Sequence, residues 1–297
     1  MKLLSKYFVY ISIVFLLIYL KKSDLLIFPK VVSYTSLVLS IFCLFVGFVF
    51  TSFTWLVILR KFDLPVNIKN SLASIGLSIF GKYIPGKLWI IVGKSGYIAE
   101  QEKLPIKKLS LIALNEQVIY LWTGLILGAI GLVAVDGVGT WGGTILISLT
   151  FFSVTIFTTF PQKLLVYLYQ KLTNRKLAVP SISFSRVITI IPFFFFTWIF
   201  WCIGFYFFVS SIVDDVIFPY IGLGFSLATT LGVVAVIAPG GIGVREGVLV
   251  GFLTLSGMTM ENATTVSVAS RLWYLSGEVF IFLLGYFIHN YGEGSTH

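Results

Sequence analysis

The amino-acid sequence predicts an all-α integral membrane bundle with about six spanning helices and two broken, re-entrant hairpins, about eight membrane segments in all. Composition is the first reason: 58% of the 297 residues are hydrophobic and only 11% are charged. Soluble domains carry about a quarter charged residues. The other reasons are several long apolar stretches and two apolar stretches that Pro and Gly interrupt. One soluble core could not bury so much apolar surface, so we expect lipid to solvate the rest.

Six apolar stretches are long enough to cross the bilayer, which takes about 20 helical residues. They are residues 7–28, 33–59, 109–135, 141–160, 187–210 and 262–288. The first is the weakest, because Lys21 to Asp24 interrupt it. It starts like a signal peptide, but no small-residue cleavage pattern follows, so we expect an uncleaved membrane helix. We expect a single polytopic membrane domain over residues 1–297.

Two further apolar stretches, residues 71–99 and 220–257, are broken in the middle by Pro and Gly. The breaks are Gly81-Lys-Tyr-Ile-Pro-Gly-Lys87 and Ala238-Pro-Gly-Gly-Ile-Gly-Val-Arg-Glu-Gly247. Proline removes a backbone donor and glycine permits a sharp reversal. Each limb of the first stretch has about a dozen residues, too few to span about 30 Å at 1.5 Å per residue. We therefore expect re-entrant hairpins with non-helical breaks that meet near the middle of the bundle.

The charge of the loops predicts the orientation, because cytoplasmic loops carry an excess of Lys and Arg. Residues 60–69, 100–108 and 161–186 are rich in Lys and Arg, so they should be cytoplasmic. In residues 136–143 and 211–219 the charged residues are all acidic, with no Lys or Arg, so these loops should be external. Lys21, Lys22 and Lys30 then fall on the external side, which does not fit. We expect a multi-pass protein of the cytoplasmic (inner) membrane of a prokaryote.

This topology implies two halves of opposite orientation, residues 1–135 and 141–288. An ungapped offset of 154 residues supports an inverted repeat. It aligns Pro85-Gly86 with Pro239-Gly240, Gly93 with Gly247, Tyr120-Leu121 with Tyr274-Leu275, and Gly131 with Gly285. The same offset joins a broken hairpin to a position on the helix that follows, as in transporters built from inverted repeats. Two unrelated Pro-Gly breaks are the alternative.

Charged side chains at membrane depth are costly and point to function. Five cations face three anions there: Lys82, Lys87, Lys94, Arg245 and Arg271 against Glu116, Glu246 and Glu278. This excess suits an anionic ligand. The alternative is that Arg245, Glu246, Glu116, Arg271 and Glu278 pair internally and only lock the bundle. For Lys94, at the exit of the first hairpin, we expect an interfacial position with its ammonium group reaching the headgroups.

The second break has the features of an anion site. A helix that begins at depth presents unpaired N–H groups and the positive end of its dipole. The segment Pro239-Gly-Gly-Ile-Gly243 ends just before Arg245, whose guanidinium matches phosphate or carboxylate. The predicted substrate-binding residues are Lys82, Lys87, Pro239, Gly240, Gly241, Gly243, Arg245, Glu246 and Arg271. The predicted polar core, with the candidate proton carriers, comprises Glu116, Gln117 and Glu278.

Other functions find little support in the sequence. The net charge of +9 lies in clusters between apolar runs, which favours membrane topology over nucleic-acid binding. No Cys/His cluster has the spacing of a metal site, no P-loop is present, and Asp214-Asp215 fits a solvated loop better than a cation site. Cys43 and Cys202 are typical of buried core thiols. We therefore expect no cofactor, no metal and no enzymatic activity.

Three motifs resemble the transmembrane region of lysylphosphatidylglycerol synthases and its stand-alone relatives. They are Gly81-Lys-Tyr-Ile-Pro-Gly-Lys-Leu-Trp89, Pro239-Gly-Gly-Ile-Gly-Val-Arg-Glu-Gly247 and Ala269-Ser-Arg-Leu-Trp273. The resemblance covers nearly the whole chain. It implies a flippase-like domain, which in bifunctional members is joined to a cytosolic aminoacyl-transferase domain. No synthase half follows the last membrane helix in this sequence.

Residues and resemblance together predict a lipid translocase that moves an anionic or lipid-linked substrate, such as an aminoacyl-phospholipid or glycolipid. Arg245, Lys87 and backbone N–H groups would hold the headgroup, with Arg271 nearby. The expected partners are membrane lipids, with no nucleic acid. The alternative is a membrane subunit that presents a lipid acceptor to a glycosyl- or aminoacyl-transferase.

Overall fold

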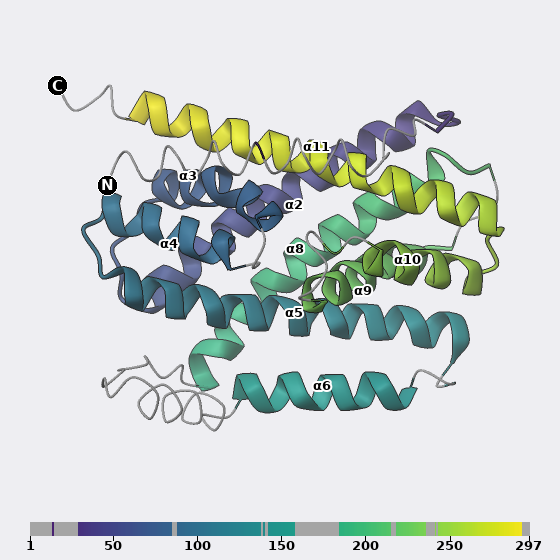
Figure 1. The fold of residues 1–297 in the computed structure, drawn as a ribbon, viewed down its shortest axis with the longest axis horizontal. Coiled ribbons are helices and arrows are strands. Elements are labelled where there is room, and N and C mark those ends of the chain that lie inside the picture. The colour runs from purple at the N-terminus through teal and green to yellow at the C-terminus, as the bar shows by residue number, and fades with distance from the viewer. Residues whose placement is uncertain are drawn as a thin grey trace.

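The computed structural model describes residues 14, 29–84, 88–137, 139, 142–157, 184–214, 218–235, 241 and 243–292. Within these residues the chain is all-α and has no strand, which confirms the predicted fold class (Figure 1). The helices are α2 (Tyr34–Lys61), α3 (Ile68–Ser78), α4 (Trp89–Gln101), α5 (Ile106–Asp136), α6 (Gly142–Phe157), α8 (Phe184–Ser210), α9 (Ile221–Val234), α10 (Val244–Leu255) and α11 (Met260–Gly292), with a short 3-10 helix, η1 (Ile79–Tyr83).

Four helices of the described residues, α2, α5, α8 and α11, are long and apolar enough to cross a membrane. They coincide with the expected spans 33–59, 109–135, 187–210 and 262–288. The stretch 141–160 forms α6, whose described part has 16 residues. Apart from Val14, the stretch 7–28 lies outside the described residues. Large apolar side chains such as Val38, Phe42 and Ile147 face outward, as expected for contact with lipid.

The helices follow the same order twice: a long helix, two short ones and another long one. The start of α9 follows that of α3 by 153 residues, α10 follows α4 by 155, and α11 follows α5 by 154. The two groups also exchange neighbours, because α3 packs against α11 and α9 packs against α5 (Figure 1). Between them, α2 and α8 pack along one another. The first short helix of each group is therefore held by the last long helix of the other group, while α4 and α10 pack against the long helix of their own group.

Each of the two apolar stretches with a Pro-Gly break forms two short α-helices and not one continuous helix. In the first, α3 gives way to η1, Ile84 is extended, and α4 starts at Trp89. The residues from Gly81 to Tyr83 are thus 3-10 helical, which departs from the expected non-helical break. In the second, α9 ends at Val234 and α10 starts at Val244. Each of the four limbs has 11 to 14 residues.

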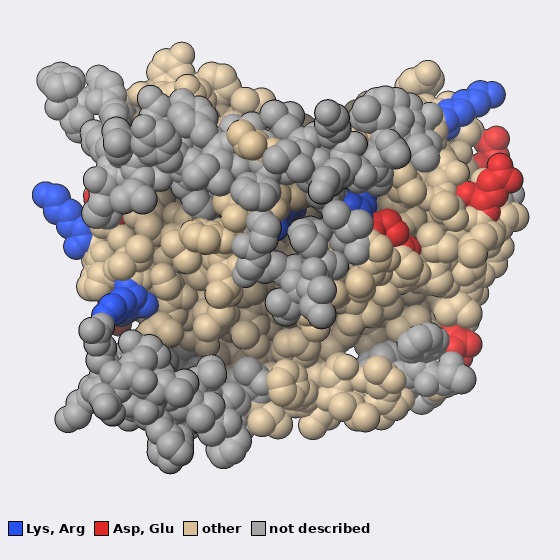
Figure 2. Space-filling model, in the orientation of Figure 1, with Lys and Arg blue, Asp and Glu red and all other residues tan. Residues whose placement is uncertain are grey.

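On the face drawn in Figure 2, Lys and Arg side chains project at the left end and at the upper right, and the larger patches of Asp and Glu lie at the right end. At the left end, Asn70 at the start of α3 donates a hydrogen bond to Glu102 after α4 at 2.8 Å, so the two basic loops are neighbours. At the other end, the N–H of Val32 donates to the carbonyl of Ser211 at 2.8 Å, next to Asp214. Residues 60–69 and 100–108, both expected in the cytoplasm, therefore lie at the same end.

Candidate functional site

Arg245 lies in the first turn of α10, immediately after the second break. Gly241 and Gly243 before it have φ of 76° and 81°, a left-handed conformation that glycine adopts without strain. A Cβ atom on Gly241 would also lie 3.0 Å from the carbonyl oxygen of Gly232. Only glycine therefore lets this backbone approach α9 so closely. The approach directs the Arg245 side chain toward the middle of the bundle.

Aromatic rings surround the Arg245 guanidinium. Its Cζ lies 5.1 Å from the ring centroids of both Phe225 on α9 and Tyr274 on α11. The Nε and Nη2 atoms are buried and have no hydrogen-bond partner among the described residues. These two nitrogens form the edge of a guanidinium that binds phosphate or carboxylate in a bidentate manner. This edge of Arg245 is therefore buried and makes no hydrogen bond to the described residues.

Lys82 and Glu278 form a second part of the site. Lys82 of η1 makes an ion pair with Glu278 of α11, and the Tyr83 hydroxyl donates to the same carboxylate at 2.7 Å. The Lys82 Nζ also lies 4.8 Å from the centroid of the Tyr274 ring, the ring that Arg245 contacts. The tip of the first broken stretch and the start of α10 thus share one aromatic side chain. Most of the second break, residues 236–240, lies outside the described residues, so the predicted meeting of the two breaks stays a prediction.

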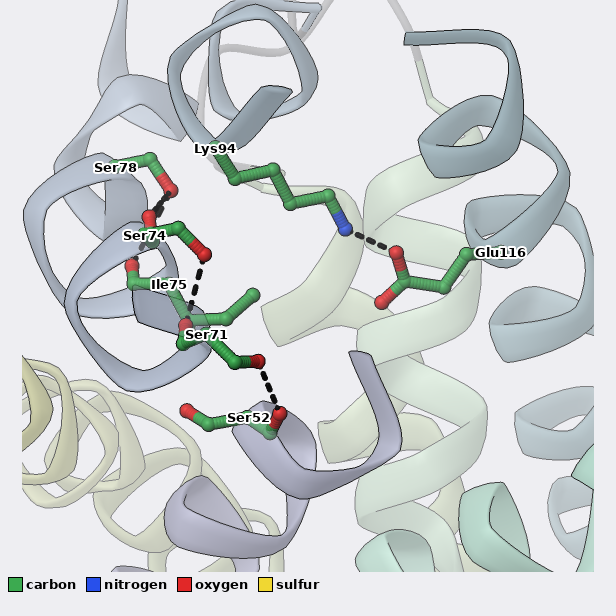
Figure 3. A network of polar contacts seen from close by, with 7 residues as sticks. All are labelled: Ser52, Ser71, Ser74, Ile75, Ser78, Lys94 and Glu116. Carbon is green, nitrogen blue, oxygen red and sulfur yellow. Dashed lines mark hydrogen bonds and ion pairs between the residues drawn. The ribbon is translucent and has the colours of Figure 1, made fainter. Parts of the chain in front are cut away.

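Lys94 and Glu116 form a separate ion pair between α4 and α5 (Figure 3). Both side chains are buried, and the Lys94 Nζ lies 4.3 Å from the Trp55 ring centroid. The expectation that Lys94 reaches the membrane interface is therefore wrong. A carboxylate on the facing helix was not visible from the hydropathy of α4. With that partner present, burial of the ammonium group beside the carboxylate costs less free energy than its isolation in lipid.

Figure 3 also shows polar side chains on α3 that are satisfied by nearby backbone carbonyls. Ser71 donates to the carbonyl of Ser52 on α2 at 2.7 Å, Ser74 to Ser71 at 2.8 Å, and Ser78 to Ser74 at 2.6 Å. Of these three bonds only that of Ser71 joins α3 to another helix, while the other two satisfy hydroxyls within α3 itself.

Glu246 joins α10 to α11 and caps α10. Its carboxylate accepts a hydrogen bond from the N–H of Gly243 at 2.7 Å and forms an ion pair with Arg271. A carboxylate at this position offsets the positive end of the helix dipole. The N–H of Gly243, one of the groups expected to bind an anionic ligand, thus donates its hydrogen bond to the Glu246 side chain instead. For an anion at this place, the Arg245 side chain remains the main donor.

The buried ion pairs leave one cation over. Within the described residues, Lys94 pairs with Glu116, Lys82 with Glu278, and Arg271 with Glu246. Arg245 has no carboxylate within ion-pair distance in that part of the chain. The alternative of complete internal pairing therefore holds for three acids and three cations but not for Arg245.

The remaining predicted residues are placed as follows. Lys87, Pro239 and Gly240 lie outside the described residues, and Gln117 is half-buried on α5. The aromatic residues Phe225, Tyr83 and Tyr274 were missed as site residues, because rings in an apolar helix do not stand out. A signal existed for Tyr274, which the 154-residue offset aligns with Tyr120. No group of His, Cys, Asp and Glu suited to a metal ion occurs in the described part of the chain.

Comparison with known families gives one match. The family model for the lysylphosphatidylglycerol synthase TM region matches residues 4–285, nearly the entire chain. The chain belongs to this family. Comparison with curated proteins and with solved structures gave no significant match. The family and the four long apolar helices make this lysylphosphatidylglycerol synthase TM region protein a multi-pass membrane protein with a lipid-related function.

Proposed function

We propose that the protein is a flippase-like translocase that binds the phosphate of an anionic or lipid-linked headgroup at Arg245 and moves it across the cytoplasmic membrane of a prokaryote. The observation that carries the proposal is the buried, unpartnered Nε and Nη2 edge of Arg245. Desolvated cations in a membrane protein are costly unless an anion neutralises them. A lipid phosphate that enters from the bilayer supplies that anion, while the lipid tail stays among the other tails.

The arrangement of the helices supports alternating access. We take the two groups α2–α5 and α8–α11 as the halves of an inverted repeat, with re-entrant hairpins at the two breaks. The equal spacing of their short helices and the mutual packing of α3 with α11 and α9 with α5 support this assignment. Arg245 contacts side chains of α9 and α11 and lies close to η1 of the first half. Rocking of one half against the other would expose such a position to either leaflet in turn.

Substitution of Arg245 tests the function. Arg245→Ala should abolish lipid movement in proteoliposomes, while the melting temperature in detergent stays near that of the unmodified protein, because no carboxylate loses its partner. Arg245→Lys should restore movement only in part, since an ammonium group cannot form the bidentate contact. Arg186→Ala is the matched control, because Arg186 is exposed and its ion pair with Asp63 is long, at 3.8 Å.

Three outcomes oppose the proposal. Normal lipid movement by a stable Arg245→Ala protein would remove this residue from the mechanism. Loss of lipid movement together with a large loss of stability, rescued by removal of an acid, would assign Arg245 to the scaffold. If the unmodified protein moves no lipid and Arg245→Ala abolishes the activity of a co-expressed glycosyl- or aminoacyl-transferase, the protein is a lipid-presenting subunit instead.

A further inference from the structure

The charges around Tyr274 are two cations and one carboxylate. Arg245 and Lys82 lie 5.1 and 4.8 Å from the centroid of this ring, so their charged groups are no more than 9.9 Å apart. Glu278 is paired with Lys82. Nearby, Glu246 and Arg271 form a pair without net charge. The described residues around the ring therefore leave a net charge of +1, which resides on Arg245.

Lys82 determines where the Glu278 carboxylate lies. Glu278 is almost fully buried, with 1% of its side chain exposed, whereas Lys82 is 28% exposed. A buried carboxylate needs a positive partner, and of the two cations at the Tyr274 ring Lys82 is the one that contacts it. Lys82 and the Tyr83 hydroxyl hold Glu278 and so keep it from pairing with Arg245. The free edge of Arg245 thus depends on a residue that does not touch it.

We propose that the Lys82–Glu278 ion pair sets the charge selectivity of the Arg245 site. With the pair intact, the site carries one positive charge and selects a lipid headgroup with one negative charge, a phosphodiester, over a phosphomonoester with two. Lys82 and Glu278 act as positioning residues, while Arg245 contacts the ligand. This inference rests on the proposed function of Arg245 and adds the residues that choose among anionic lipids.

The pair differs from the two other buried ion pairs in what it connects. Lys94–Glu116 joins α4 to α5, and Glu246–Arg271 joins α10 to α11, so each lies within one group of helices. Lys82–Glu278 joins η1 of the first group to α11 of the second. It is the only buried ion pair among the described residues that crosses between the groups. A change in the charge of this pair therefore changes the net charge beside the Tyr274 ring, which Arg245 also contacts.

A series of four proteins changes this charge in single steps. The local charge is +1 in the unmodified protein, +2 in Glu278→Gln, 0 in Lys82→Met and again +1 in the double variant. The probes are phosphatidylglycerol, a phosphodiester with one negative charge, and phosphatidic acid, a phosphomonoester with about 1.5 to 2 near neutral pH. Each lipid is mixed at equal amounts into neutral phosphatidylcholine nanodiscs, and the bound lipid is counted by native mass spectrometry.

The expected pattern follows the charge. The unmodified protein binds phosphatidylglycerol in preference, and Glu278→Gln shifts the ratio toward phosphatidic acid by about tenfold, the effect of about 1.4 kcal/mol. Lys82→Met loses both lipids, because Glu278 then pairs with Arg245. The double variant regains phosphatidylglycerol binding, because no carboxylate then remains to pair with Arg245. The shift of the lipid ratio in Glu278→Gln is the result that a purely structural role of Lys82 would not give. The exposed pair Arg186→Gln with Asp63→Asn serves as control and leaves the ratio unchanged.

Melting temperatures of all variants separate folding from binding. Glu278→Gln leaves Lys82 partly solvated, so this variant tests the proposal even if Lys82→Met does not fold. An unchanged lipid ratio in Glu278→Gln, or full lipid binding by Lys82→Met, would overturn the selectivity role alone. If Arg245→Ala binds both lipids to the same extent as the unmodified protein does, the proposed function is overturned instead.

Discussion

Lys94 of α4 and Glu116 of α5 form an ion pair in which both side chains are nearly enclosed, with 7% and 8% exposed. The pair fixes the short α4, which follows the first break, to a long helix of the same group. The ring of Trp55 on α2 covers the Lys94 ammonium group. The helices α2, α4 and α5 therefore meet at this one charged contact.

Removal of one partner of this pair should destabilise the protein strongly. Lys94→Ala leaves the Glu116 carboxylate buried without its cation, and such a change costs about 3–5 kcal/mol. Lys94→Met with Glu116→Gln should recover most of this loss, because no buried charge remains unpaired. Thermal unfolding in detergent measures both effects, and Lys103→Ala in an exposed loop is the control. An unchanged unfolding temperature in Lys94→Ala would contradict the enclosed pair.

The contact between α3 and α11 should tolerate no side chain at Gly76. A Cβ atom there would lie 2.3 Å from the Ile281 carbonyl oxygen and 2.9 Å from the Gly285 Cα, and neither backbone atom can move aside easily. Gly76→Ala should therefore separate the helices and cost about 1–3 kcal/mol, as overpacking does. Gly251→Ala is the matched control, since its Cβ atom would have no neighbour within 4 Å. Chemical unfolding of both variants gives the comparison, and equal stability would refute the close crossing.

The orientation of the bundle can be tested by cysteine labelling in a Cys43→Ser, Cys202→Ser background. Lys103→Cys lies in a loop expected in the cytoplasm, and Gly139→Cys lies at the opposite end of α5. An impermeant maleimide should label position 139 in intact cells and position 103 only after the cells are opened. The reverse pattern would invert the topology that the Lys and Arg asymmetry predicts.

Much of the fold could be predicted because the solvent imposes it. Lipid requires continuous apolar helices, and so α2, α5, α8 and α11 are visible as hydropathy alone. Pro and Gly interrupt helices through their own backbone geometry. The breaks between α3 and α4 and between α9 and α10 therefore fall at the Pro and Gly residues of the sequence. The 3-10 form of η1 was not visible, because its residues from Ile79 to Tyr83 carry no signal that separates it from an irregular turn.

The sequence alone determined that charges lie at membrane depth, that cations exceed acids, and that Arg245 follows a glycine-rich break. Only the tertiary structure decided which of the described cations stays without an acid. Lys82, Lys94 and Arg271 take the three carboxylates, from partners 196, 22 and 25 residues away in the chain. Pairing depends on which side chains face each other across helices, and hydropathy carries no information about that geometry. The rings of Phe225 and Tyr274 became part of the site for the same reason: packing of α9 and α11 brings them to Arg245.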